Sequence, residues 1–360
     1  MRNKIRGLLL VVCAASLTPT AWGAITFNVS FNDPNGDLAA AANLIQSHIQ
    51  AAGKLWADHL VGSANIEVVV RPSAAVPFAE GRSFTSSFVH TNGPLNVFEQ
   101  GMAAEIRTGV DPNGADPDVD IEINPDYVYN ELWFDPDPNA RVAPVDVNRT
   151  DAMSTFLHEF GHALGYGGWI NGSTGTYPGD YQSTYDERTL FDGTNFFFNG
   201  PEAMAVYGRE VPLTYANVAH VANFDPRPGQ DLLLDLMNGL VFYRGSRYVI
   251  SPLNIAMLRD AGVPAFYLPG DYDLNRTVDD ADYATWRAAF GATTQPFVDG
   301  SRDGTVDAAD YTIWRDRREA GFAAAGASAV PEPAAWPMLA AVCIVTVATR
   351  SLDGRKVGRL

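Results

Sequence analysis

The chain has 360 residues, a formal net charge of −17 and a pI near 4.6. That length suits one sizeable domain with smaller modules, and the acidic balance argues against nucleic acid and anionic membrane surfaces as partners. Its 2 cysteines, Cys13 and Cys343, lie near the two ends. The body between them can therefore rely on neither disulfide bonds nor thiolate chemistry, so a core and bound metal must stabilise it.

The first residues have the composition of a secretory signal. Basic residues at positions 2, 4 and 6 precede an apolar run over residues 8–17. Small residues on either side of Trp22 suit cleavage before Ala24. We therefore expect residues 1–23 to be a signal peptide and the mature chain to be exported.

The first part of the mature chain alternates strands with a long helix. Residues 25–31 alternate apolar and polar side chains and predict a strand, and residues 66–70 and 119–123 predict two more. Residues 38–60 are alanine-rich with helical periodicity and predict a long helix that is interrupted or ends near Gly53. This order of elements, leading into a second helix, favours an α+β fold.

The second helix is predicted to begin just after residue 150. Thr150 and Asp151 suit its N-cap, and Gly165 and Gly167 suit its end. Apolar side chains recur within it at helical spacing and would bury one face against a core: Met153, Phe156, Leu157, Phe160 and Leu164.

This helix carries the sequence His-Glu-Phe-Gly-His-Ala-Leu-Gly at residues 158–165. His158 and His162 are four residues apart and share one helix face, so both imidazoles can reach one metal ion. Glu159 beside them is the candidate general base for a metal-activated water. The H-E-x-x-H pattern is typical of zinc proteases, and a helix with two ordinary histidines is the plain alternative.

A catalytic zinc needs three protein ligands and one open position. The most compact continuation of the motif would place a third histidine at position 168, which is Gly168. His220 is the last histidine of the chain and so the only downstream choice, whereas His48, His59 and His90 precede the motif and are assigned no role. A carboxylate is the alternative third ligand, from among Asp180, Asp186, Glu187, Asp192, Glu202 and Glu210.

A long insertion and a closing helix follow the motif. Residues 167–213 are rich in Gly, Asn, Tyr and Asp and predict a loop, which the aromatic residues 196–198 would fasten to the body. Ser251 and Pro252 suit the N-cap and first position of a last helix that stops at Gly262.

The motif, the long insertion, His220 and the segment Asp235-Leu236-Met237-Asn238-Gly239 together resemble the leishmanolysin-like branch of the metzincin metalloproteases, over roughly residues 150–264. The resemblance implies a domain over residues 24–267 with a mixed sheet, an active-site helix and a C-terminal helix. It also implies individual roles: zinc ligands His158, His162 and His220, general base Glu159, a turn methionine beneath the metal at Met237, and a sharp turn at Gly165 after the second ligand.

The implied activity is that of an exported zinc endopeptidase acting on a protein or peptide substrate. Zinc would activate a water and polarise the scissile carbonyl, while Glu159 takes the proton and delivers it to the leaving amine. Some metzincins carry a tyrosine two residues after the turn methionine, where this chain has Gly239. The specificity pocket is expected near residues 240–251. The alternative is a non-catalytic surface or matrix scaffold, or adhesin, which would have no need of Glu159.

An internal repeat follows at residues 271–282 and 299–310. Each loop leads into a Tyr and, three residues later, a Trp. Hard oxygen ligands in loops of about twelve residues suit Ca²⁺. The pattern resembles the dockerin type I repeat and implies a helical calcium module over residues 268–320. The expected ligands stand at matched loop positions: Asp271, Asp273, Asn275, Asp279 and Asp282, then Asp299, Ser301, Asp303, Asp307 and Asp310.

The two loops are not equal. Arg276 stands where the second loop has Gly304 at the turn, which predicts weaker binding in the first loop. The dockerin resemblance implies a cohesin-like partner, and a calcium-stiffened spacer is the alternative.

Residues 321–360 predict a linker and a sorting tail. The sequence Val-Pro-Glu-Pro at residues 330–333 precedes an apolar run over residues 334–349 and a basic end. That run is short for a membrane span of about 20 residues, and the basic end would stay inside. The tail resembles the PEP-CTERM signal, which implies processing by an exosortase at the inner membrane and a final place in the envelope, surface or matrix of a Gram-negative bacterium. A permanent membrane anchor is the alternative.

Overall fold

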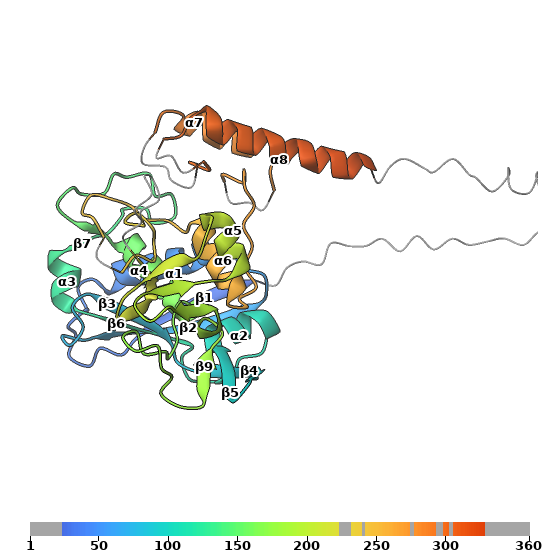
Figure 1. The fold of residues 1–360 in the computed structure, drawn as a ribbon. Coiled ribbons are helices and arrows are strands. Elements are labelled where there is room, and N and C mark those ends of the chain that lie inside the picture. The colour runs from blue at the N-terminus through green and yellow to red at the C-terminus, as the bar shows by residue number, and fades with distance from the viewer. Residues whose placement is uncertain are drawn as a thin grey trace, which may run out of the picture.

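The computed structural model describes residues 24–222, 232–239, 242–273, 277–292, 298–301 and 305–327. The expected signal peptide and sorting tail, with Cys13 and Cys343, lie outside these ranges, as do Asn275, Arg276 and Asp303. Within them the fold is mixed α+β, as the order of elements predicts (Figure 1). Among the helices of these ranges, none is both long and apolar enough to cross a bilayer.

The main sheet has four strands in the order β1-β2-β6-β3. β1 (Ile25–Phe31), β2 (Ala64–Pro72) and β6 (Val119–Ile123) run parallel, and β3 (Ala79–Ser83) pairs antiparallel with β6 at the edge. The three strands predicted from the sequence are therefore confirmed. β3 was not predicted, because its residues, Ala-Glu-Gly-Arg-Ser, lack the apolar alternation of a strand.

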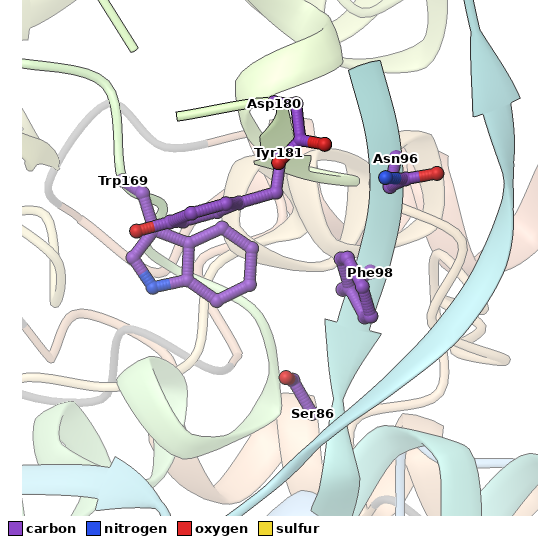
Figure 2. A pocket seen from close by; sticks show the side chains of 6 residues that line it. All are labelled: Ser86, Asn96, Phe98, Trp169, Asp180 and Tyr181. Atoms are coloured by element: carbon purple, nitrogen blue, oxygen red, sulfur yellow. The ribbon is translucent and has the colours of Figure 1, made fainter. Parts of the chain in front are cut away.

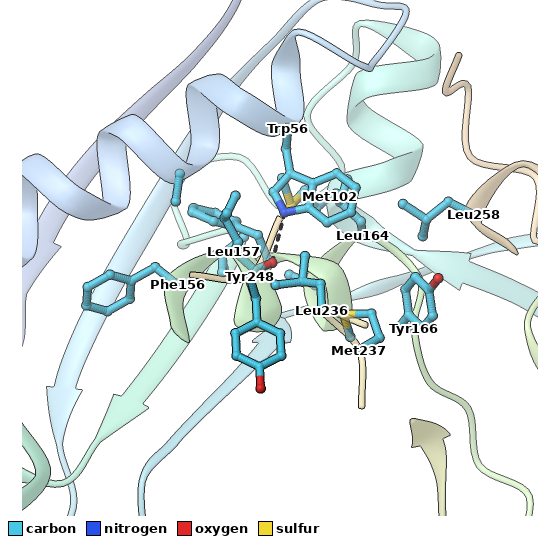
Figure 3. Packing of buried hydrophobic residues seen from close by; sticks show 14 of the residues in the cluster. Trp56, Met102, Phe156, Leu157, Leu164, Tyr166, Leu236, Met237, Tyr248 and Leu258 are labelled. Atoms are coloured by element: carbon cyan, nitrogen blue, oxygen red, sulfur yellow. Dashed lines mark hydrogen bonds between the residues drawn. The ribbon is translucent and has the colours of Figure 1, made fainter. Parts of the chain in front are cut away.

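Two helices, α1 (Ala42–Ala57) and α4 (Ala152–Leu164), pack against each other and join the sheet in one core. The indole nitrogen of Trp56 donates a hydrogen bond of 2.9 Å to the carbonyl of Leu157, which ties the end of α1 to the middle of α4 (Figure 3). The ring of Phe27 on β1 meets that of Phe160 on α4 edge to face, with centroids 5.3 Å apart.

The predicted break in α1 near Gly53 was wrong, because the helix continues to Ala57 and begins at Ala42 rather than at residue 38. A Cβ at Gly53 would lie 2.6 Å from Cγ of Phe27. This glycine therefore serves the close packing of α1 on β1 and does not end the helix.

The segment after α4 was predicted to be a loop. Residues 165–180 have no helix or strand, but residues 189–221 include a small antiparallel sheet of order β10-β11-β12-β13. Phe196 and Phe198 of this sheet are buried in the main core, which confirms that the aromatic run fastens the insertion to the body. The strands of this small sheet are too short to show the alternation of apolar and polar residues that predicts a strand. The elements of the insertion are β9 (Tyr181–Ser183), η1 (Asp186–Arg188), β10 (Thr189–Phe191), β11 (Phe196–Phe198), α5 (Pro201–Tyr207), β12 (Val211–Thr214) and β13 (Asn217–Val221).

The last helix of the body, α6 (Pro252–Asp260), begins at the predicted Ser251 cap, where Ser251 and Asn254 exchange capping hydrogen bonds. β5 pairs with β4 and β9 in a three-stranded sheet, and β7 pairs with β8. The remaining elements of the body are β4 (Ser86–Asn92), β5 (Leu95–Gln100), α2 (Gly101–Thr108), α3 (Pro125–Asn130), β7 (Leu132–Trp133) and β8 (Thr150–Asp151).

The C-terminal helices α7 (Asp280–Ala289) and α8 (Ala308–Ala327) lie beside each other (Figure 1). They share a second apolar cluster, separate from the main core, that centres on four buried side chains: Tyr272, Val298, Val306 and Trp314.

Candidate metal centre

Three histidines that the sequence singles out converge on one point. The Nε2 atoms of His158 and His162, on α4, are 3.0 Å apart. The Nε2 atom of His220, on β13, lies 3.0 Å from that of His158 and 3.2 Å from that of His162. The insertion thus folds back and brings its last strand to the face of the motif helix.

The hydrogen bonds on the far side of two rings fix which nitrogen carries the proton. His158 Nδ1 donates to the carbonyl of Leu236 and His162 Nδ1 to the carbonyl of Tyr166, each at 2.7 Å. A carbonyl only accepts, so in the neutral rings both Nε2 atoms bear lone pairs that point at each other. Lone pairs this close repel, and a shared cation is the arrangement that relieves them.

The distances fit a tetrahedral ion. Zn–N bonds of ~2.0–2.1 Å at tetrahedral angles separate ligand nitrogens by ~3.3 Å, close to the spacing found. Burial lowers the pKa of His158 to about 3 and also lowers those of His162 and His220. In all three rings burial therefore favours the neutral form, which is the form that binds a metal.

No other side chain that the structure describes joins this group of ligand atoms. His48 is buried with Nδ1 bonded to the Leu44 carbonyl, and His90 pairs with Glu187 at 3.1 Å. The carboxylates considered as alternative ligands are engaged elsewhere or lie apart. Asp186, for example, accepts hydrogen bonds from the backbone nitrogens of the residues around it.

Glu159 is on α4, and its side chain contacts the edge strand β3. Its Oε2 atom accepts a hydrogen bond of 2.5 Å from the backbone nitrogen of Gly81. Burial raises the pKa of Glu159 to about 8, against the lowering effect of that hydrogen bond. A Cβ at Gly81 would lie 2.5 Å from Cβ of Glu159, so the glycine allows β3 to pack directly on the helix.

Met237 lies among the buried apolar side chains around α4, near Leu236 and Tyr166 (Figure 3). It is fully buried, and a Cβ at Gly161 would lie 2.6 Å from its sulfur, so α4 approaches it as closely as a glycine permits. Its carbonyl accepts a hydrogen bond of 2.9 Å from Val221, the neighbour of His220. One short segment therefore supports both α4 and β13.

Asp235 fastens this segment to α6. Its Oδ1 atom accepts from the backbone nitrogen of Met237 at 2.9 Å and from the side chain of Asn254 at 2.8 Å. Its Oδ2 atom accepts from the hydroxyl of Ser251 at 3.0 Å. The cap of the last helix and the turn below the histidines are thus one polar network.

The glycines after the second histidine end the helix, as the sequence predicts. Gly165 is the C-cap of α4, and a Cβ there would lie 3.3 Å from the side chains of Leu258 and Val263. Gly167 has the positive φ of 149°. At Gly239 a Cβ would lie 3.0 Å from that of His220, which explains why no larger residue stands there.

The expected pocket segment contributes two rings. Phe242 meets His158 edge to face, with centroids 5.4 Å apart, and stacks on Tyr248 at 4.3 Å. Residues 240–241 lie outside the described ranges.

A separate cavity of about 310 Å³ is lined by residues of the three-stranded sheet and of the segment that leads into β9. Trp169 and Tyr181 form one wall, and Asn96 and Phe98 of β5 form the other (Figure 2). No pattern in the sequence predicts this cavity, because its residues come from distant segments.

The two acidic loops are built alike. Asp282 accepts hydrogen bonds from the backbone nitrogens of Tyr272 and Asp279, at 2.6 and 2.8 Å. Asp310 does the same in the second loop with Ser301 and Asp307, both at 2.7 Å. In each loop the twelfth residue therefore closes the loop onto its own backbone.

Two tryptophans join the loops reciprocally. Trp286 donates its indole proton to the carbonyl of Asp307 at 2.8 Å, and Trp314 donates to that of Asp279 at 2.7 Å. Carboxylate oxygens of Asp271, Asp273 and Asp282 gather within 4.8 Å of one another. The repeat in sequence is thus a pseudo-symmetric pair in space.

A scan of protein-family models and a search of curated proteins found no match to this chain.

Proposed function

We propose that the protein is an exported zinc endopeptidase of the metzincin type, resembling its leishmanolysin-like branch. The observation that carries the proposal is that the Nε2 atoms of three histidines lie within 3.2 Å of one another. The buried carboxylate of Glu159 directly follows the first of these histidines on α4. His158, His162 and His220 would hold the ion. Three protein ligands leave the fourth position open, as catalytic rather than structural zinc sites do.

Zinc in this position would lower the pKa of a water and polarise a carbonyl. Glu159 would accept the proton of that water on its carboxylate and pass it to the leaving amine. The hydrogen bond from Gly81 holds the carboxylate in place. The carbonyls of Leu236 and Tyr166 orient two imidazoles, and Met237 supports the ligand-bearing elements from below.

The unpaired edge of β3 favours an extended peptide as the substrate. No described strand pairs with its outer edge, where Gly81 bonds to Glu159. An extended peptide added to that edge would run past the histidines with its backbone hydrogen-bonded. Phe242 and Tyr248, beside His158, would then contact a substrate side chain.

We further propose that the paired loops bind Ca²⁺ as a dockerin-like module with a cohesin-like partner, and that the tail is removed by an exosortase-type enzyme. Asp282 accepts from the backbone nitrogen of Asp273 and Asp310 from that of Ser301, each at the third position of its loop, and these matched bonds support the calcium assignment. An intact mass of envelope protein that still ends at Leu360 would contradict processing.

Zinc content and casein hydrolysis of the native chain and His220→Ala test the function. We expect one zinc per native chain, loss of zinc and hydrolysis in His220→Ala, and no change in His90→Ala, whose exposed imidazole pairs with Glu187 outside the site. Full zinc and activity in His220→Ala would contradict the ligand set. Zinc without hydrolysis in the native chain would favour the scaffold or adhesin.

A further inference from the structure

A second group of ligand atoms lies away from the histidines. Glu105 is on α2, Asp118 directly precedes β6, and Asp111 is in the connection between these elements. One carboxylate oxygen from each lies within 4.8 Å of the others. Glu105 and Asp118 are only 3% and 1% exposed, whereas Asp111 is exposed, so the group is closed below and open to solvent above.

Each buried carboxylate has one oxygen in use and one without a donor. Glu105 Oε1 accepts from the backbone nitrogen of Asn65 at 2.9 Å, and Asp118 Oδ2 accepts from that of Glu67 at 2.8 Å. The other two atoms, Glu105 Oε2 and Asp118 Oδ1, are buried and receive no hydrogen bond. A buried carboxylate oxygen without a donor is costly, so such atoms indicate a missing partner.

The surrounding charges are acidic. Glu67 and Asp111 both act on Glu105 as like charges, and Glu105 acts in the same way on Asp118. In the described part of the chain no lysine or arginine forms an ion pair with any of these carboxylates. Four carboxylates held together without a counter-charge repel one another, and a cation would reverse the sign of that interaction.

The connecting loop adds a further oxygen. Residues 111–118 read Asp-Pro-Asn-Gly-Ala-Asp-Pro-Asp. Asp111 Oδ1 accepts from the backbone nitrogens of Asn113 and Gly114, which folds the loop over the group. Asn113 Oδ1 is also buried and receives no hydrogen bond, although the nitrogen of the same amide donates to the carbonyl of Pro117 at 3.0 Å.

We propose that Glu105, Asp111 and Asp118 bind a calcium ion, and that Asn113 in the connecting loop offers its unpartnered Oδ1 to the same ion. The available donors are all oxygens, which suit calcium and not zinc, and calcium takes carboxylates, amides and waters in a flexible shell. The ion would join the end of α2 to the start of β6. β6 in turn pairs with β3, and Gly81 of β3 donates a hydrogen bond to the carboxylate of Glu159 on α4.

Hydrogen exchange of the native full chain, with calcium or with a calcium chelator, tests the proposal. At ten times the dissociation constant, calcium should slow exchange through local opening over residues 105–118 about tenfold. The readout is local, so it is independent of whether the paired loops also bind calcium. Equal exchange over this segment in both conditions would overturn the proposal, and a proton shared by Glu105 and Asp118 would then account for the two oxygens.

Two variants give a second, independent readout. Glu105→Gln and Asp118→Asn should each bind one calcium ion fewer per chain in equilibrium dialysis, while Asp116→Asn, in the same loop but outside the group, should match the native chain. In chelator the two variants should melt at or above the native temperature, because each removes a repelling charge. An unchanged calcium count in well-folded variants would overturn the proposal.

Discussion

The histidine centre brings together two segments distant in sequence, whereas each acidic loop offers its carboxylates within one short stretch, and the two kinds of site are held by different means. The histidines rest on a large core that includes α1, α4 and the main sheet, and two of them are oriented by backbone carbonyls. The loops share a small cluster around Tyr272 and Trp314 and are closed by Asp282 and Asp310. The histidine site should therefore keep its geometry without a metal ion, whereas the acidic loops should need bound cations to keep theirs.

The largest effect is expected from calcium removal. A chelator should remove the protection of α7 and α8 amides from hydrogen exchange, because acidic side chains that face one another lose their counter-charge. The amides of α1 and α4 should keep theirs. Undiminished protection of α7 and α8 in chelator would show that the small cluster is sufficient by itself.

Truncation below the histidines should show how much the body supports the first site. Met237→Ala should lower the free energy of unfolding by about 2–5 kcal/mol, since it leaves a cavity at a fully buried side chain. Met237→Leu, which keeps the volume, should cost less than about 1.5 kcal/mol. Urea unfolding measures both, and equal effects of the two substitutions would show that sulfur chemistry, not packing, matters here.

The pH dependence of the free energy of unfolding, measured without metal, reports on the carboxyl group of Glu159. Its pKa is about 8 in the folded chain against 4.5 when unfolded, so the folded state holds the extra proton between these values and loses stability as pH rises. The pKa values of the three histidines are lowered from 6.5, so their titration changes the free energy of unfolding only below about pH 6.5.

Between pH 6.5 and 8, denaturant unfolding should therefore show the native chain losing up to about 2 kcal/mol relative to Glu159→Gln. Zinc should flatten this difference, because a nearby dication favours the carboxylate. Parallel pH profiles of the two metal-free chains would contradict the buried-acid account.

The smallest effect concerns the reciprocal indoles of the loops. Trp286→Phe and Trp314→Phe each remove one hydrogen bond and should each destabilise the calcium-loaded module by about 1 kcal/mol. Because each indole bonds to the opposite loop, each change should weaken calcium binding at the loop it contacts. Weakening confined to the loop that bears the substitution would contradict the pairing.

Sequence reasoning succeeded where a signal was local. The spacing of His158 and His162 and the alternation of β1 and β6 are written within a few residues, and the predicted boundaries of both strands match. His220 is the only histidine after the motif, but the sequence left a carboxylate open as the alternative third ligand, and the resemblance to the metzincins favoured the histidine. The cap at Ser251 was likewise a local pattern.

What failed depended on contacts between distant residues. Gly53 looks like a helix end until Phe27 is known to lie against it. The contact between Gly81 and Glu159 spans 78 positions, and the bond from His158 to Leu236 spans another 78. The carboxylate group of Glu105 was missed for the same reason, since its burial depends on β2 and α2 meeting.

The most direct test of the central claim is zinc content and casein hydrolysis of the native chain and Glu159→Gln. Glu202→Gln, whose exposed carboxylate pairs with Arg259 of α6, is the matched control. We expect one zinc per chain in all three and a loss of roughly 10²–10⁴-fold in hydrolysis for Glu159→Gln alone. Undiminished hydrolysis in that variant, or a native chain without zinc, would contradict the assignment of Glu159 and the three histidines as a catalytic centre.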